Sequence, residues 1–365
     1  MSTVAPKPVL RAQIGARTVP IHLGAGVLGA VGPVLAAAAE GDGVFVVVDD
    51  GVLPAGEQVA ASCRDAGMRV HVEAVPAGEA SKNLGELERL ARAAARAGIR
   101  RRDAVVAVGG GVVGDLAGFL AASYQRGVRL VQVPTTLLAM VDSALGGKTG
   151  VDLPEGKNYV GAVYQPETVV MDPVVLGTLP ARELSCGFAE VVKYGLLVGG
   201  DLMEIVAAWP ELPGPDDALA DLIRRCAECK LEVVAEDEMD LGRRAILNLG
   251  HTVGHGIEAA GGYDLYHHGE AISLGLLAAL RVSERELGLD PTWRRGTADT
   301  LGRHGLPVTL DPSVDVDQVI EIMGRDKKSD GRALNMVLLR APGDVLTHQD
   351  PDPAVVRAAV EELVP

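Results

Sequence analysis

Aromatic residues and positive charge are both scarce in this sequence. Phe, Trp and Tyr make up 3% of the 365 residues, so alanine, valine and leucine must build most of the core, which suits alternating strands and helices. The formal net charge of −15 argues against a surface that binds nucleic acid or an anionic membrane, because phosphate groups repel such a chain. A phosphorylated ligand would therefore need a local cluster of lysines and arginines.

Cysteines and long apolar runs are also lacking. Four cysteines do not form a disulfide framework in a chain of this length, and a reducing cytosol is the simpler interpretation. Cys226 and Cys229 have C-x-x-C spacing, but no second pair accompanies them within their helical pattern, which favours helix packing over metal binding. No apolar run reaches the ~18 residues of a membrane span, and the N-terminal stretch has no signal-peptide core. We expect a soluble cytoplasmic protein.

The first half of the chain alternates strand and helix patterns. Short apolar runs at 44–50, 68–75, 103–111 and 128–134 predict buried strands, and the segments between them predict helices. This order is typical of a Rossmann-like α/β domain with a mostly parallel sheet. After about position 180 helical spacing dominates, with one hairpin expected within 332–348. We expect an α/β domain over 1–178 and a mainly helical domain over 179–365.

A glycine-rich turn in the first half has the spacing of a nucleotide site. Gly109, Gly111 and Gly114 satisfy G-x-G-x-x-G between a strand and a helix, where glycine lets a pyrophosphate approach the backbone. The acidic residue usual about 20 positions downstream is missing. A tight strand-to-helix turn without a ligand is the alternative.

Polar residues at other strand ends support the nucleotide site. Asp49 ends one strand, Glu79 and Lys82 follow the next, and the segment 134–150 offers hydroxyls, an acid and a lysine. Ligands of open parallel sheets bind at the carboxyl ends of strands. The sequence therefore predicts a nicotinamide dinucleotide site without the standard fingerprint.

The second half contains a group of candidate metal ligands. His251 and His255 lie four residues apart, but Thr252 replaces the glutamate of H-E-x-x-H proteases. His267 and His268 open another helical segment, and Glu190 projects from an earlier one. A carboxylate with two imidazoles is a common zinc set that leaves a position open for substrate. A structural role for the histidines is the alternative.

Basic residues recur in apolar or glycine-rich segments, where a solvated lysine is unexpected. Each could extend along the surface to reach water, but as a set they predict an anion site. They are Lys148, Lys157, Lys193, Lys230, Arg244, Lys327 and Lys328.

Several motifs occur together and in order over roughly positions 40 to 340. They are GEASK, GGGVVGDLAGF, PTTLLAMVDSALGGKTGVDLPEGKN, LPARELSCGFAEVVKYG, LNLGHTVGHGIE, HHGEAISLG and DKKSDG. As a set they resemble the 3-dehydroquinate synthases of the sugar-phosphate cyclase group. The resemblance implies a dehydroquinate synthase-like fold, a homodimer, tightly held NAD and a divalent metal, Zn²⁺ or Co²⁺. The implied reaction converts 3-deoxy-D-arabino-heptulosonate 7-phosphate to 3-dehydroquinate and phosphate in the shikimate pathway of aromatic amino-acid biosynthesis.

The resemblance also assigns roles to single residues. The metal ligands would be Glu190, His251 and His268, and Arg126 would reach the substrate phosphate of the neighbouring subunit. The other substrate contacts would be Lys148, Asn158, Lys193, Lys230, Arg244, Asn248, His255 and one of Lys327 and Lys328. The catalytic set would be Lys148, Lys193, Asp240, Arg244, Asn248 and His255. The NAD contacts would be Asp49, Glu79, Lys82, Gly111, Val112, Asp115, Thr135, Thr136, Asp142, Lys148, Lys157 and Asn158.

Two points qualify this assignment. The family usually has Glu where this sequence has Asp240, so the role of that carboxylate is open. Gly250 and Gly254 would keep the surface of their helix low where substrate approaches.

The alternative functions are another sugar-phosphate cyclase, such as an amino-dehydroquinate or valiolone-type synthase, and an NAD-dependent polyol dehydrogenase. A catalytically inactive binding protein is disfavoured because no metal-ligand position is lost.

Overall fold

The computed structural model describes residues 5–38, 40–210, 216–330 and 334–365. It forms two compact units, one comprising Met1–Leu179 and Gly214–Met239, the other Pro180–Pro213 and Asp240–Pro365. The first break lies one residue from the expected boundary. The segment Gly214–Met239 differs from the expected division, because it packs with the α/β unit rather than with the helices around it in sequence.

A seven-stranded sheet forms the centre of the first unit, in the order β1-β2-β9-β6-β5-β3-β4. Its strands are β1 (Leu10–Ile14), β2 (Arg17–Leu23), β3 (Gly43–Asp49), β4 (Arg69–Val75), β5 (Ala104–Gly109), β6 (Arg129–Pro134) and β9 (Thr168–Met171). All neighbouring pairs from β2 to β4 are parallel, and only the edge hairpin β1–β2 is antiparallel. The predicted parallel α/β fold is confirmed, and the four predicted strands match β3, β4, β5 and β6.

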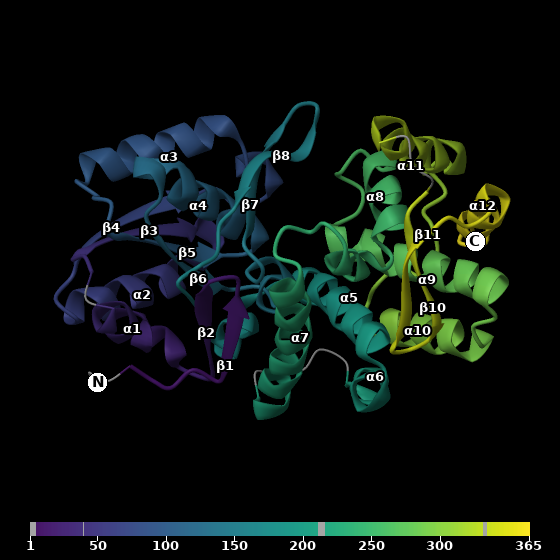
Figure 1. The fold of residues 1–365 in the computed structure, drawn as a ribbon, viewed down its shortest axis with the longest axis horizontal. Helices are drawn as coiled ribbons and strands as arrows, with labels where there is room; N and C mark the ends of the chain where they lie inside the picture. Colours follow the sequence, from purple (N-terminus) through teal and green to yellow (C-terminus); the bar gives the residue numbers. More distant parts are fainter. Residues whose placement is uncertain (1–4, 39, 211–215, 331–333) are drawn as a thin grey trace. The chain divides into compact units, whose positions relative to one another are not determined.

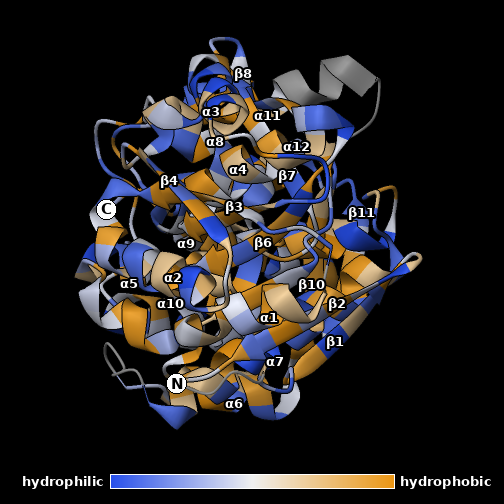
Figure 2. Cartoon of the chain, turned by 90° about the vertical axis from the view of Figure 1, so that its left-hand side faces the viewer, coloured by the Kyte–Doolittle hydropathy of each residue, from blue (hydrophilic) through white to orange (hydrophobic). Residues whose placement is uncertain are grey.

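Helices cover both faces of this sheet (Figure 1): α1 (Val31–Ala37) and α2 (Leu53–Asp65) on one, α3 (Leu84–Arg96) and α4 (Gly111–Ser123) on the other. Strand β3 shows why both are needed. Its residues Phe45 and Val47 pack in the core beneath α3 and α4, whereas Val46 and Val48 pack beneath α1 and α2. A strand that is apolar on both faces must be covered on both, and Figure 2 shows such hydrophobic strands inside the unit.

Shorter elements complete the first unit. A separate antiparallel hairpin joins β7 (Lys148–Leu153) to β8 (Gly156–Val163), and a π-helical turn, η5 (Ala139–Ser143), precedes it. Helix α7 (Asp217–Glu236) packs against β1 and η5, which explains why its segment belongs here. The 3₁₀ turns are η1 (Val27–Ala30), η2 (Asp50–Val52), η3 (Glu79–Ser81), η4 (Tyr124–Arg126) and η6 (Pro173–Thr178).

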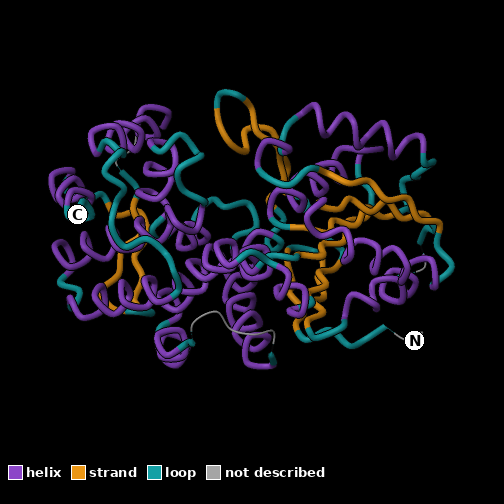
Figure 3. Tube along the Cα trace, turned by 180° about the vertical axis from the view of Figure 1, so that it is seen from behind, coloured by secondary structure: helices purple, strands orange, loops and turns teal. Residues whose placement is uncertain are grey.

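The second unit is mainly helical, as predicted (Figure 3). Its elements are α5 (Ala181–Val198), α6 (Gly200–Ala208), η7 (Arg243–Asn248), α8 (His251–Ala260), α9 (His268–Leu287), α10 (Pro291–Arg303), α11 (Val316–Asp330), α12 (Pro353–Glu361), and the strands β10 (Met336–Ala341) and β11 (Asp344–Gln349). The two strands pair antiparallel, which confirms the expected hairpin. No helix within the described ranges is long and apolar enough to cross a membrane.

Helices α8 and α9 approach closely through glycines. A Cβ built on Gly275 would lie 2.1 Å from the carbonyl oxygen of Gly250 and 2.7 Å from the amide nitrogen of Gly254. A Cβ on Gly254 would lie 2.9 Å from Cδ1 of Ile272. These glycines therefore permit helix packing. The expectation that Gly250 and Gly254 keep a surface open for substrate was wrong, because α9 occupies that space.

Candidate functional site

Three side chains from three helices of the second unit form a candidate metal centre. Glu190 projects from α5, His251 is the first residue of α8, and His268 is the first residue of α9. One ligand atom from each lies within 4.8 Å of the other two. The Nε2 atoms of His251 and His268 lie 3.6 Å and 3.5 Å from Oε1 of Glu190. The fold thus brings together the three residues that the resemblance named as metal ligands.

The second nitrogen of each imidazole already has an acceptor. Nδ1 of His251 donates to the carbonyl oxygen of Leu249 at 3.1 Å, and Nδ1 of His268 donates to Oε2 of Glu258 at 3.4 Å. With the proton on Nδ1, Nε2 presents its lone pair toward Glu190. Histidines that bind metals usually donate their other N–H in this way. The donor set of one carboxylate and two Nε2 atoms therefore fits a zinc-type ion.

Burial and nearby charges shift the pKa values of the two histidines in opposite directions. Burial, then the nearby Lys193 cation, lower the pKa of His251 to about 3. Burial also lowers the pKa of His268, but hydrogen bonds to Glu190 and Glu258 outweigh it and raise the pKa to about 9. At neutral pH, and with no metal bound, His251 is therefore uncharged, whereas the two carboxylates keep His268 protonated. A metal that binds Nε2 of His268 would replace the proton on that nitrogen.

His255 occupies a different position from His251, although both lie on one face of α8. Its ring centroid lies 5.3 Å from that of His251 and 5.9 Å from that of His268. The group that contains Glu190 does not include it; it belongs to a second group with Glu258 and His268. Sequence reasoning missed Glu258. The signal was its spacing, seven residues after His251 and three after His255, on the same helical face.

The candidate nucleotide residues of the first unit gather at one edge of the sheet. A Cβ on Gly109, at the end of β5, would lie 3.2 Å from Cβ of Asp49, at the end of β3. A Cβ on Gly110 would lie 3.1 Å from Cγ2 of Thr136, and the amide of Thr135 donates to the carbonyl of Gly109 at 2.9 Å. Gly111 and Val112 then begin α4. The carboxyl ends of three parallel strands thus meet at the glycine-rich turn, as predicted.

The buried Lys82 and four further candidates form a polar cluster. Its Nζ lies 2.7 Å from Oδ2 of Asp115 and 3.8 Å from Oε1 of Glu79, and donates to Oδ1 of Asn158 at 2.6 Å. Lys157 also lies 3.8 Å from Glu79. Burial lowers the pKa of Lys82, but the neighbouring carboxylates of Asp115 and Glu79 raise it above its usual value. The side chain therefore stays cationic and can present charge to an anion.

Lys230 joins α7 to the π-helical turn η5. Its Nζ donates to the carbonyl oxygen of Asp142 at 2.7 Å and lies 2.9 Å from the Oδ1 atom of the same residue. Lys148 begins β7 and is exposed. The first unit therefore contains Lys148, Asn158 and Lys230 of the predicted substrate set.

Three candidate residues have a positive φ, which is uncommon outside glycine. They are Arg126 at 63°, Asn158 at 59° and Asp240 at 58°. Such strained positions cluster at functional sites. Aspartate tolerates this conformation better than most residues, which gives a physical reason for the shorter acid at position 240.

The remaining candidates lie in the second unit. Arg244 and Asn248 share the turn η7, where Arg244 is buried and Asn248 is exposed. Lys327 and Lys328 fall within α11, but their side chains lie outside the described residues.

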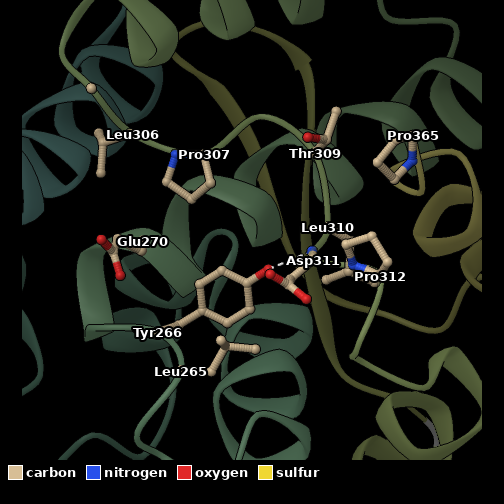
Figure 4. A pocket seen from close by; sticks show the side chains of 11 residues that line it. Leu265, Tyr266, Glu270, Leu306, Pro307, Thr309, Leu310, Asp311, Pro312 and Pro365 are labelled. Carbon is tan, nitrogen blue, oxygen red and sulfur yellow. Dashed lines mark hydrogen bonds between the residues drawn. The ribbon is translucent and has the colours of Figure 1, made fainter.

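A surface pocket of the second unit is lined by residues other than these candidates. Tyr266, Glu270, Leu306 and Asp311 contribute to it, and the Tyr266 hydroxyl accepts a hydrogen bond from the amide of Asp311 at 2.7 Å (Figure 4). None of the predicted site residues lines it.

A class of synthases of known structure shares the fold of this chain. The fold matches 2-deoxy-scyllo-inosose synthase complexed with carbaglucose-6-phosphate, NAD⁺ and Co²⁺, with a TM-score of 0.87 and 28% identity over 97% of this chain and 99% of that one. It also matches the 2-epi-5-epi-valiolone synthase of Streptomyces hygroscopicus subsp. jinggangensis 5008, with NAD⁺ and Zn²⁺ bound, with a TM-score of 0.84 and 27% identity over 97% and 98% of the two chains.

Within this class, the chain belongs to the 3-dehydroquinate synthase family. The family's N-terminal sequence model matches residues 72–186 and its C-terminal model matches residues 187–329. The 3-dehydroquinate synthase of Caulobacter vibrioides (strain NA1000 / CB15N) is 44% identical over 363 residues, which cover 96% of this chain and 97% of that protein.

Proposed function

We propose that this protein is a 3-dehydroquinate synthase that converts 3-deoxy-D-arabino-heptulosonate 7-phosphate to 3-dehydroquinate and phosphate. The observation that carries the proposal is the convergence of Glu190, His251 and His268 in a chain of this family. The reaction comprises a transient oxidation, β-elimination of phosphate, re-reduction and an intramolecular aldol closure. It belongs to the shikimate pathway, and we place it in the cytoplasm.

The cofactors would be NAD and a divalent metal, Zn²⁺ or Co²⁺. When bound, NAD supplies a reversible hydride acceptor and the metal supplies a Lewis acid. Glu190, His251 and His268 would hold the metal through the donor atoms described above. The NAD contacts would come from the glycine-rich turn with Asp49, Thr135 and Thr136, from Asp142, and from the cluster around Lys82.

The basic residues would bind the phosphate and the carboxylate of the substrate. In the first unit, Lys148, Asn158 and Lys230 are the proposed contacts. In the second unit they are Lys193, Arg244, Asn248, His255 and one of Lys327 and Lys328, with Asp240 orienting neighbouring groups. Loss of phosphate develops negative charge on the leaving group, and fixed cations and hydrogen-bond donors stabilise that charge. His255, which does not belong to the group that contains Glu190, would contribute there.

The protein would act as a homodimer in which Arg126 reaches the neighbouring active site. Its exposed position in a left-handed turn supports this proposal. Mixed dimers of R126A and H268A test it, because one site would then have both His268 and an arginine from the other subunit. Activity above that of either parent supports a contribution across the interface, and activity no higher than the parents contradicts it.

Phosphate release from the heptulosonate phosphate, assayed with substoichiometric NAD, tests the function itself. We expect many turnovers for each NAD, because the net redox change is zero. Release that needs stoichiometric NAD, or no release, would contradict the proposal. Release from a sugar phosphate that has no carboxylate would instead indicate another cyclase. Net NADH production from a simple alcohol would indicate a polyol dehydrogenase.

A further inference from the structure

Glu258 is a buried carboxylate next to the candidate metal centre. It lies on α8, is 4% exposed, and accepts a hydrogen bond from Nδ1 of His268 at 3.4 Å. A carboxylate buried to this extent is costly unless charged or hydrogen-bonded partners compensate it. The hydrogen bond from His268 provides such a partner for Glu258.

The two histidines of the metal centre differ in what holds their second nitrogen. His251 donates to the backbone carbonyl of Leu249, a neutral acceptor that any residue at position 249 would supply. His268 donates to the carboxylate of Glu258, a charged acceptor that depends on one side chain. A carboxylate acceptor fixes the orientation of a ligating imidazole and makes its free nitrogen a stronger donor.

The geometry distinguishes this role from direct ligation. Nε2 of His268 faces Glu190, whereas Nδ1 of the same ring faces Glu258. Opposite nitrogens of one ring cannot both ligate a single ion, so Glu258 acts on a metal at Glu190 through the ring. We propose that Glu258 is a positioning residue that orients His268 and strengthens metal binding. This inference rests on the metal site put forward under the proposed function.

Metal affinity of the purified full-length protein tests the proposal. Zn²⁺ dissociation constants would be measured by chelator competition for the wild type, E258Q and E258A, together with the visible absorption spectrum of the Co²⁺ forms. Gln keeps the shape and an acceptor oxygen but removes the charge. We expect weaker binding by about 10-fold for E258Q and up to about 100-fold for E258A, with an altered Co²⁺ spectrum.

The matched control is E284Q. Glu284 is another buried carboxylate of this unit, on α9, where it pairs with Arg281 and Arg294. Its loss should lower the melting temperature of the metal-free protein without changing Zn²⁺ affinity. Wild-type affinity and spectrum in both Glu258 variants would overturn the inference while leaving the metal site intact. A wild-type protein that binds no metal would instead contradict the metal site of the proposed function, and the inference with it.

Discussion

Lys193 and Glu190 form an ion pair one helical turn apart on α5, and each side chain is 1% exposed. Two charges buried this deeply are strongly coupled, because little water screens them. Glu190 also faces the Nε2 atoms of His251 and His268. A lysine cation and two imidazoles thus share one carboxylate, so changes at Lys193 should affect metal binding and catalysis differently.

K193M should separate these two effects. Methionine is similar in length but uncharged, so a cation that opposes the metal at Glu190 is removed and Zn²⁺ should bind at least as tightly as in the wild type. The kcat/KM for phosphate release should fall by about 10- to 100-fold, the usual cost of losing a charged hydrogen bond. Chelator competition and steady-state kinetics measure the two quantities. Weaker metal binding would show that Lys193 mainly holds Glu190 in place.

H268A should abolish metal binding and activity, because it removes one of the three donors. The adjacent His267 provides the control, since it caps α9 but pairs with Glu183 rather than with Glu190. H267A should lose about 1 kcal/mol of stability through the lost cap while it keeps the metal. Metal content after dialysis and phosphate release report the outcome. Activity of H268A in chelator-treated buffer would refute the ligand assignment.

The buried thiols predict a loss of stability in alkaline solution. Burial raises the pKa of Cys63 and Cys186 to about 12 from an ordinary 9.0, with nearby carboxylates adding to the shift at Cys186. A raised folded pKa means that the stability is fully present below pH 9 and is lost as the pH rises toward 12. Each thiol should cost about 1.4 kcal/mol of unfolding free energy between pH 8 and pH 10.

Urea unfolding at the two pH values measures this loss. The double variant C63A/C186A corrects for lysines and tyrosines that titrate in the same range. Its unfolding free energy should depend less steeply on pH than that of the wild type. Equal slopes would mean that the thiols ionise normally in the folded state.

G275A should destabilise the contact between α8 and α9. The added Cβ would overlap the backbone of Gly250 and Gly254, and overpacking of this kind costs about 1–3 kcal/mol or more. G296A on α10 is the control, because nothing lies within 4 Å of its Cβ and its φ is not positive. That substitution should stabilise the protein by about 0.5–1 kcal/mol. Thermal unfolding of both variants tests the contrast.

The local architecture could be predicted because its signals are local. The all-apolar run of β3 and the glycine-rich turn between β5 and α4 are readable within a few residues, since strand and helix periods are set by the backbone itself. The hairpins β1–β2 and β7–β8 were not predicted. Helix α7 was expected in the second unit, because a helical period does not reveal which core the apolar face will join.

The candidate site, too, could be predicted only in part from the sequence. The residue types, their spacing and the resemblance singled out Glu190, His251 and His268 and the polar strand ends, and these follow from the order of the chain. The resemblance also separated His251 from His255, and the structure agrees, because His251 groups with Glu190 and His255 does not. Only the tertiary structure showed that Glu258 accepts a hydrogen bond from His268. It also showed that Gly250 and Gly254 receive a neighbouring helix rather than a substrate. Such choices depend on close packing between distant segments, which no local pattern encodes.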